Sequence, residues 1–254
     1  MRIFGSVIAL ILPDGVYSTK SDINYNSYAL NIGGTGNLNI EGCIFDNFNT
    51  YTSSNSAFII SCSNSTMKST EIINLNSKNS NGPAFITYGS GSHIIEDTVI
   101  DTFAVTNSLK GGVISVNANA NVQANNLTIS NINAAINLGM IQVSGRFSAK
   151  NSNFKNNVLK TGSSVSNVYS LFYVNNGNLT IETSSISHNR GFNYLIQENG
   201  GNSISTVNYN GIIGNTPKVS LVSTIGNSNF NYNWWGTNDK PGDFAENWVL
   251  MNFS

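Results

Sequence analysis

The chain has little charge and few of the residues that usually carry catalysis or bind metals. Lysine, arginine, aspartate and glutamate make up 10% of its 254 residues, the net charge is −1, and there are two histidines and two cysteines. A nucleic-acid-binding protein needs a basic face that releases counterions from phosphates, so we expect no nucleic-acid partner. The histidines and cysteines lack the spacing of metal ligands, so we expect no metal and no cofactor.

The sequence also lacks a long apolar run, so no segment is expected to span a bilayer as a helix. Met1-Arg2 and the following IFGSVIALIL have the charge and apolar run of a signal peptide, but the run is short and no clear cleavage site precedes PDGVYS. We favour residues 7–12 as the first strand and 13–15 as its turn, within a longer secreted precursor.

Against these absences, asparagine is abundant, with 44 copies, and hydrophobic residues reach 40% with 10% aromatics. So many apolar residues are incompatible with a disordered chain, and the polar residues must surround a packed core. The length fits one large all-β domain or two average domains.

An irregular repeat runs through the sequence. Each copy has a short apolar run, a polar turn, a second segment that alternates apolar and polar residues, and an asparagine-rich end. The apolar runs are AFII (57–60), AFIT (84–87), VISV (113–116), MIQV (140–143), LFYV (171–174) and YLIQ (194–197). The second segments are NLNIEGCIFDNF, STMKSTEIINLN, SHIIEDTVIDTF, NVQANNLTISNI, RFSAKNSNFKNN, NLTIETSSISHN and, with one residue inserted, NSISTVNYNGII.

A late apolar position anchors each copy: Phe45, Ile73, Ile100, Ile129, Phe154, Ile186 and Ile212, with gaps of 28, 27, 29, 25, 32 and 26 residues. The alternation within each copy has the period of β-strands and excludes helical-pair repeats. Copies stacked at the strand spacing of roughly 4.8 Å align like side chains in columns. The sequence therefore predicts an all-β parallel β-helix, a β-solenoid with about 28 residues per coil.

The alternation also predicts which side chains face the core. In the segment from Asn178 to Asn189, Leu179, Ile181 and Ile186 point inward, and Thr180 and Glu182 point outward. The matching inward sets are Leu38, Ile40 and Phe45; His93, Ile95 and Ile100; Val122, Ala124 and Ile129; and Phe147, Ala149 and Phe154. His93 is the one polar member, and we interpret it as a core or rim histidine. Asparagine tolerates left-handed backbone and suits the corners, where amides of successive coils would pair in ladders.

Nothing in composition or charge divides the chain between Asn24 and about Asn233. We predict a single β-helix domain over 1–233 and a C-terminal capping segment over 234–254. Trp234 and Trp235 would cover the open end of the core, although stacking on a sugar is the alternative. Cys43 and Cys62 occupy unlike positions of the repeat, which favours two buried thiols over a disulfide.

These patterns resemble a family. GGVI at 111–114 and Phe/Ile-x-x-Asn at Ile73–Asn76, Phe154–Asn157, Ile186–Asn189, Ile212–Asn215 and Phe230–Asn233 are similar to repeats of polymorphic outer-membrane proteins. The tail NFNYNWWGTNDKPG followed by NWVLMNF resembles the end of the β-helix in adhesin-like surface proteins of methanogenic archaea. The resemblance implies a right-handed, pectin-lyase-like β-helix, a place at the cell surface or outside the cell, and an Ig-like module after the tail.

Polysaccharide lyases and hydrolases share this fold class, so catalysis needs a test. Glycoside hydrolysis requires two carboxylates about 5 to 9.5 Å apart. Glu96, Asp97 and Asp101 are the best candidates, but Glu96 and Asp97 are adjacent and point to opposite faces of a strand, and Asp101 shares the face of Asp97 only if a turn intervenes. The neighbouring copies offer no second acidic cluster, since they hold Lys68, Ser130, Asn131 or their neighbours there.

A lyase would need calcium-binding carboxylates beside an arginine or lysine base. None of the three arginines, Arg2, Arg146 and Arg190, lies in a copy with several acids. His188 and Arg190 have only Glu182 and Glu198 in the flanking copies, so we interpret both as polar surface residues.

We therefore expect a non-catalytic, adhesin-like surface or secreted protein that contacts glycans or a partner cell, with no catalytic, metal or cofactor residues. The alternatives are a divergent polysaccharide lyase or glycoside hydrolase, and a structural spacer. Glycosylation sequons start at Asn64, Asn126, Asn178 and Asn252, but several are expected by chance in so asparagine-rich a chain.

Overall fold

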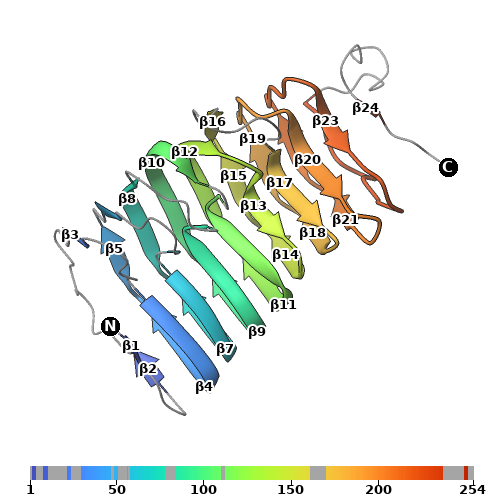
Figure 1. Cartoon of the computed structure of the whole chain (residues 1–254). Coiled ribbons are helices and arrows are strands. Elements are labelled where there is room, and N and C mark those ends of the chain that lie inside the picture. Colours follow the sequence, from blue (N-terminus) through green and yellow to red (C-terminus); the bar gives the residue numbers. More distant parts are fainter. Residues whose placement is uncertain are drawn as a thin grey trace.

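The computed structural model describes residues 2–3, 8–10, 22–23, 30–46, 49–50, 56, 58–77, 84–109, 112–160, 170–236 and 249–250. Strands and turns make up these residues, and none of them is helical. The strands stack along one axis as a parallel β-solenoid of about six turns (Figure 1). The predicted all-β solenoid, with coils about 28 residues apart, is confirmed.

The larger sheet has 14 strands, and every pair of neighbours in it is parallel. Its main path is β1 (Arg2–Ile3), β4 (Leu30–Glu41), β7 (Phe58–Lys68), β9 (Ile86–Glu96), β11 (Ile114–Asn125), β13 (Gly139–Val143), β17 (Ser170–Asn175), β20 (Tyr194–Asn199), β23 (Ser220–Ser223) and β24 (Val249–Leu250). β2 (Ile8–Leu10), β14 (Arg146–Lys150), β18 (Asn178–Glu182) and β21 (Ile204–Asn208) lie off this path. The long β11 pairs with both β13 and β14, so it spans two segments that are separate strands in the next coil.

The second sheet has 10 strands and is also parallel. It contains β3 (Asp22–Ile23), β5 (Ile44–Asp46), β6 (Asn49–Thr50), β8 (Glu71–Ser77), β10 (Val99–Leu109), β12 (Thr128–Ile136), β15 (Asn153–Lys155), β16 (Val158–Lys160), β19 (Ser185–Ser187) and β22 (Gly211–Ile213). Each coil therefore contributes strands to both sheets, and the inward side chains of the two sheets form one continuous core.

The predicted inward residues lie in this core. Leu179, Ile181 and Ile186 are at most 1% exposed, and the matching residues of the other copies are buried, apart from the partly buried Phe45. Aromatic rings also pack on one another between coils; the ring centroids of Phe154 and Phe172 are 5.0 Å apart and nearly perpendicular.

The strand pairing corrects the alignment of the second copy. The alternation predicted Ile73 as its inward anchor, but Ile72 pairs with Phe45 and is fully buried, whereas Ile73 is half-buried. The copy begins at Asn64, which pairs with Asn37, one residue earlier than predicted. Two adjacent isoleucines conceal the register, because a shift by one residue exchanges the two faces of a strand.

The seventh copy also needs correction. It was predicted to begin at Asn202 and to contain an inserted residue. The structure pairs Ile204 with Asn178 and Ile212 with Ile186, and both pairs are 26 residues apart. The copy therefore starts at Ile204 without an insertion.

Most of the described non-glycine residues with left-handed backbone occupy two columns of corners; Asn176, in the turn between β17 and β18, is outside them. The first corner directly follows the ends of β4, β7, β9, β11, β14, β18 and β21. It holds Gly42, Ser69, Asp97, Asn126, Asn151, Thr183, Tyr209 and, in the last described coil, Tyr232. The second corner holds Asn74, Thr102, Asn131, Asn156, His188 and Gly214. Asparagine is the commonest residue in the two columns, as its tolerance of this conformation predicts.

The predicted asparagine ladders are also present. Asn157, Asn189 and Asn215 follow one another in successive coils, and each Nδ2 donates to the Oδ1 of the next at 2.8 Å. Asn210 and Asn233 form a second ladder at 3.0 Å in another column. Two of the Phe/Ile-x-x-Asn matches, Ile73–Asn76 and Phe230–Asn233, therefore lie outside the first ladder.

The strand predicted over 7–12 corresponds to β2, which is shorter and spans Ile8–Leu10. It is not the first strand, because β1 comes before it in the chain. The turn predicted at 13–15 lies outside the described residues. β24 pairs with β23, so part of the predicted capping segment belongs to the larger sheet.

Candidate functional site

One regular surface of the described coils is the outward side of β4, β7, β9, β11, β14, β18 and β21, which we call the outer face. Three columns of side chains run along it. The first holds Asn37, Asn64, Ser92, Asn121, Arg146, Asn178 and Ile204; the second Asn39, Thr66, Ile94, Gln123, Ser148, Thr180 and Thr206; the third Glu41, Lys68, Glu96, Asn125, Lys150, Glu182 and Asn208. Amides and hydroxyls dominate the first two columns.

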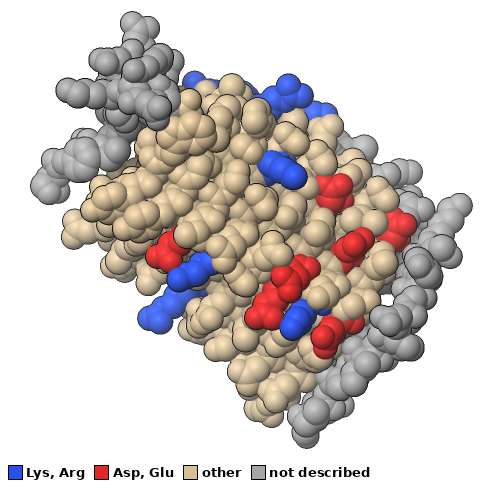
Figure 2. All heavy atoms as spheres, turned by 180° about the vertical axis from the view of Figure 1, so that it is seen from behind, with Lys and Arg blue, Asp and Glu red and all other residues tan. Residues whose placement is uncertain are grey.

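The third column alternates in charge, and its cations pair with neighbouring carboxylates. Nζ of Lys68 lies 3.7 Å from Oε2 of Glu96, and Nζ of Lys150 lies 2.9 Å from Oε2 of Glu182. Figure 2 shows the sparse charges as mixed groups of both signs on a surface that is mainly uncharged. This face therefore has no single-sign field that would attract a highly charged partner.

Two adjoining hollows lie on this face. The first, of about 220 Å³, is lined by Ile94, Glu96, Gln123, Ala124, Asn125, Ser148 and Lys150. The second, of about 270 Å³, is lined by Asn121, Gln123, Arg146, Phe147, Ser148, Asn178 and Thr180. Both include Gln123 and the short side chain of Ser148, which pairs with Gln123 on the next strand and leaves space between longer neighbours.

The hollows combine an apolar patch with amide, hydroxyl and charged groups. Ile94 is 41% exposed at the edge of the first hollow. Arg146 is exposed in the second, and its guanidinium makes no ion pair with any residue that the structure describes. Sequence reasoning discarded Arg146 because no acidic cluster lies near it, and the hollows were not predicted because they depend on which side chains meet between coils.

The candidate acids of the third copy do not act together in the structure. Glu96 ends β9 on the outer face, while Asp97 occupies the first corner with a φ of 48° and accepts a hydrogen bond from Asn126. Asp101 lies on β10, in the other sheet, and accepts hydrogen bonds from Ser130, Asn131 and Thr102. A corner does separate Asp97 from Asp101, but each carboxylate is held by neighbouring side chains of the protein.

The hydrogen bonds also control the ionisation of Asp101. Partial burial by itself raises the pKa of this carboxyl, but the hydrogen bonds from Ser130, Thr102 and Asn131 outweigh burial and lower the pKa below its ordinary value of 3.8. A catalytic acid would need a raised pKa. Asp101 is therefore suited to remain an ionised acceptor that ties two coils together.

The acids of the outer face are also widely spaced. Glu96 and Glu182 lie in one column, separated by Asn125 and Lys150. Three strand spacings of about 4.8 Å place these carboxylates roughly 14 Å apart along the axis, beyond the 5 to 9.5 Å of a glycosidase pair. Lys150 also neutralises Glu182. Glu41 and Glu96 lie closer, two strand spacings or roughly 10 Å apart, but Lys68 lies between them and pairs with Glu96. The carboxylates of this column are thus separated or ion-paired, unlike those of a glycosidase pair.

His188 and Arg190 take structural places. His188 occupies the second corner with a φ of 54°, where other coils have asparagine, threonine or glycine. The imidazole lies against the next coil, since a Cβ added to Gly214 would come within 2.9 Å of its Cδ2. The backbone of Arg190 bridges to Val158 and Thr216. Among the described residues, neither His188 nor Arg190 forms an ion pair with a carboxylate.

Glu198 is a buried acid whose role sequence reasoning missed. It is 3% exposed and occupies an inward column in which the preceding coil has Val174. Its carboxylate accepts hydrogen bonds from the backbone N–H groups of Ile225 and Gly226 and from the hydroxyl of Ser228. The signal was an acid at a position that carries an apolar residue in other copies. Glu198 secures the loop that follows β23.

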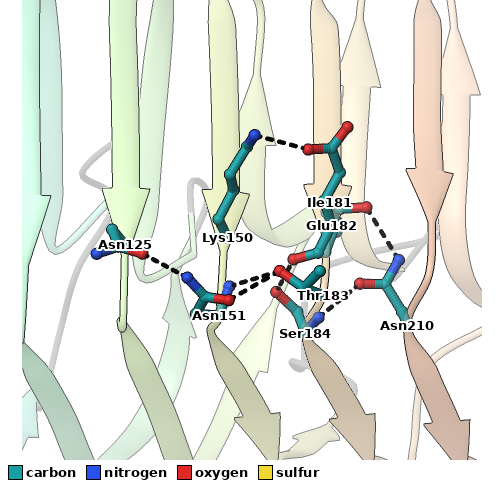
Figure 3. A network of polar contacts seen from close by, with 8 residues as sticks. All are labelled: Asn125, Lys150, Asn151, Ile181, Glu182, Thr183, Ser184 and Asn210. Atoms are coloured by element: carbon teal, nitrogen blue, oxygen red, sulfur yellow. Dashed lines mark hydrogen bonds and ion pairs between the residues drawn. The ribbon is translucent and has the colours of Figure 1, made fainter.

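The first corner carries a network that links four coils, as Figure 3 shows. Asn151 donates to Asn125 at 2.9 Å and accepts from the Thr183 hydroxyl at 2.9 Å. Behind it, Asn210 accepts from the backbone N–H of Ser184 and donates to the carbonyl of Ile181. The polar groups of these corners are thus used within the protein.

Buried polar groups in the core also have structural partners. His93 is fully buried, as predicted; its Nδ1 lies 2.8 Å from the Ser65 hydroxyl and its Nε2 lies 3.0 Å from the carbonyl of Ser90. Burial lowers the pKa of His93 below its ordinary value. Cys43 and Cys62 are both buried and unpaired, in accord with the predicted thiols, and burial raises the pKa of each.

The predicted sequons and tryptophans differ in how exposed they are. The sequon residues Asn64, Asn126 and Asn178 are exposed, while Asn252 lies outside the described residues. Trp235 packs against the core, as expected of a lid, whereas Trp234 is 51% exposed. Among the residues that the structure places, no group of three histidine, cysteine, aspartate or glutamate side chains could hold a metal ion.

Comparison with known proteins supplies no relative. No family model, no curated protein and no solved structure matches the chain. The resemblance to pectin-lyase-like and adhesin-like proteins is therefore supported only as far as the solenoid itself. Within the described part of the chain, the search for a helix long and apolar enough to cross a membrane found none.

Proposed function

We propose that this protein is a non-catalytic, cell-surface or secreted β-solenoid that contacts glycans through its outer face. The observation that supports the proposal is the pair of hollows around Gln123 and Ser148, which combine amides, hydroxyls and a free guanidinium with the exposed Ile94. Amides both donate and accept hydrogen bonds, as sugar hydroxyls do, and a small apolar patch suits the C–H groups of a sugar ring.

The solenoid geometry favours a polymeric ligand. Equivalent positions on the outer face recur at the strand spacing of about 4.8 Å, so a polysaccharide along the axis would meet similar polar groups on successive coils. The mixed and sparse charge of the face favours a glycan bound by hydrogen bonds over one bound by a strong electrostatic field.

A binding assay with the purified chain tests the proposal. We expect immobilised polysaccharides to retain the wild-type protein and the double variant Gln123→Ala/Arg146→Ala to be retained several-fold less. The matched control is Lys155→Ala, which removes an exposed cation of β15 in the other sheet. Glycan contact at this face would be refuted if no polysaccharide retained the wild-type chain. It would also be refuted if the wild type and Gln123→Ala/Arg146→Ala were retained equally.

Location and chemistry need separate measurements. The adhesin-like resemblance leads us to expect labelling of intact cells, or of the culture medium, by an antibody against the chain.

The competing lyase or hydrolase function predicts shortening of an acidic polysaccharide by the purified protein, which we do not expect because the acids of the outer face are far apart or paired.

A role as a spacer has its own support. The corner amides bond to one another across coils instead of facing solvent unpaired, as in the chain from Asn125 through Asn151 to Thr183. Such ladders stiffen a rod. A chain that holds another module away from the surface would show no glycan retention and would remain rigid, so the binding assay separates the two functions.

A further inference from the structure

Three aromatic side chains near the C-terminal end of the described solenoid are exposed to solvent. Tyr209 is 60% exposed, Tyr232 73% and Trp234 51%. They do not close the core, because Trp235 and Phe230 are the aromatic residues of this region that pack against it. The lid function expected of the tail therefore leaves Tyr209, Tyr232 and Trp234 unexplained.

The two tyrosines form an ordered stack. Their ring centroids are 5.0 Å apart and the ring planes differ by 6°. Tyr209 and Tyr232 succeed Thr183 in the first corner, so the stack runs along the axis of the solenoid. One broad face of Tyr232 is turned toward Tyr209, and Tyr232 is nevertheless the more exposed of the two residues.

The backbone disfavours tyrosine at both positions. The φ angles of Tyr209 and Tyr232 are 60° and 59°, in the left-handed region, where the preceding coils have asparagine at Asn126 and Asn151. A bulky residue is unfavourable there, and neither ring gains burial in return. Tyrosine therefore adds no core packing at these positions; what it adds is the exposed ring stack.

Trp234 provides a second and independent observation. Its backbone bridges to Gly211, at a position where the two preceding coils have Ser185 and Asn153. A Cβ added to Gly211 would have only Ile213 Cδ1 within 4 Å, at 3.9 Å. Trp234 therefore stands at an outward position where the preceding coils have glycine, serine and asparagine, and its indole is exposed two residues after Tyr232.

We infer that Tyr209, Tyr232 and Trp234 form a platform that binds the apolar face of a neutral pyranose unit of a polysaccharide. Flat aromatic faces suit the C–H face of such a ring, and the tyrosine hydroxyls at the rim suit its hydroxyls. The neighbouring corner residues Asn126, Asn151 and Thr183 are uncharged, which favours a neutral sugar over an acidic one. The inference rests on the proposed function in assigning a glycan, but it uses residues outside the outer-face hollows.

Titration of the full chain with cellohexaose, laminarihexaose and mannohexaose, followed by intrinsic tryptophan fluorescence and calorimetry, tests the platform. We expect at least one neutral hexaose to bind saturably. Tyr232→Asn should weaken that binding by about tenfold or more, the scale of one lost aromatic stack. Because asparagine suits the left-handed corner better than tyrosine, the same variant should melt at an equal or higher temperature than the wild type.

Two further variants keep the test decisive. Trp234→Ser restores the residue type found at Ser185 and leaves the backbone bonds of position 234 in place, so it should also weaken binding of the hexaose. Val219→Asn removes an exposed apolar residue outside the platform and should bind like the wild type.

The outcomes distinguish the platform from the outer face. Binding that is lost in Tyr232→Asn and Trp234→Ser but kept in Gln123→Ala/Arg146→Ala supports the platform. Unchanged binding in the first two variants overturns it while leaving glycan contact intact. Absence of binding to every neutral hexaose also overturns it. Size-exclusion chromatography gives a further outcome: if the wild type self-associates and Tyr232→Asn does not, the aromatic residues bind a second copy of the chain and the glycan platform is wrong.

Discussion

The side-chain amide of Asn157 donates a 2.8 Å hydrogen bond to Oδ1 of Asn189, and both residues are completely buried. The backbone N–H of Asn157 donates to the same oxygen, and Nδ2 of Asn189 donates to the carbonyl of Phe154. One side chain thus satisfies three buried groups of the preceding coil. The ladder replaces apolar packing at a corner where Phe103 and Ile132 stand in the two coils before Asn157.

The first prediction concerns this ladder. Asn189→Ala should lower the free energy of unfolding by roughly 3 kcal/mol, because it removes the acceptor of the backbone N–H and of one side-chain N–H of Asn157, and the side-chain donor to the carbonyl of Phe154, at a buried place. Denaturant unfolding measures the change. Asn133→Ala, at an exposed position of β12, is the control and should change stability by less than about 0.5 kcal/mol. Equal stability of the two variants would mean that the ladder contributes little.

The second prediction concerns the buried His93. Its pKa is lowered by burial, so the unfolded chain binds more protons than the folded chain below the ordinary value of 6.5. The stabilisation is complete above pH 6.5 and is lost as the pH falls through the folded-state pKa. The double variant Ser65→Ala/His93→Leu removes the buried imidazole together with its hydroxyl partner and should show a smaller decrease in unfolding free energy between pH 7 and pH 5. His188 is present in both proteins, so it does not affect the comparison; equal pH dependence would contradict the prediction.

The third prediction concerns Asp101. Its pKa is lower in the folded chain than the ordinary 3.8, since the hydrogen bonds from Ser130, Thr102 and Asn131 outweigh burial. The stabilisation from this carboxylate is present above pH 3.8 and is lost as the pH falls through the folded-state pKa. Asp101→Asn should be less stable than the wild type at pH 7, and the difference should shrink at pH 3. Thermal melts at both pH values measure it, and a constant difference would exclude Asp101 as an acid-sensitive tie.

The fourth prediction concerns Glu198. Glu198→Ala should expose the backbone amides of Ile225 and Gly226 to faster hydrogen exchange and should destabilise the chain by about 2–3 kcal/mol, because the hydrogen bonds that a buried carboxyl group accepts are lost. Glu198→Gln keeps one acceptor oxygen and should have a smaller effect. Unaltered exchange at both amides in the alanine variant would show that the loop after β23 is held by other contacts.

Sequence reasoning succeeded where a pattern recurred. The inward columns of Leu179, Ile181 and Ile186 could be predicted because strand alternation repeats in every coil, and the left-handed asparagines because few other residues accept that conformation. It failed where two registers were equally apolar, as at Ile72 and Ile73, and where a single residue departed from the pattern, as at Glu198.

The candidate surfaces were less accessible to prediction. The hollow at Ser148 exists because a short side chain meets Gln123 across β14 and β11. The pairing of Tyr209 with Tyr232 depends on a coil of 23 residues, shorter than the others, which brings two tyrosines into one corner column. Neither the Gln123–Ser148 pairing nor the Tyr209–Tyr232 stack can be predicted until the register of each coil is known.

The sequence by itself determined that the chain forms stacked β-coils around an apolar core, because the alternation of side chains is local and repeats along the chain. The tertiary structure alone decided which outward residues meet between coils, where the buried Glu198 bonds, and which aromatics cap the core and which face solvent. These outcomes depend on coil length and strand register, which change by single residues and move every outward side chain to a new neighbour.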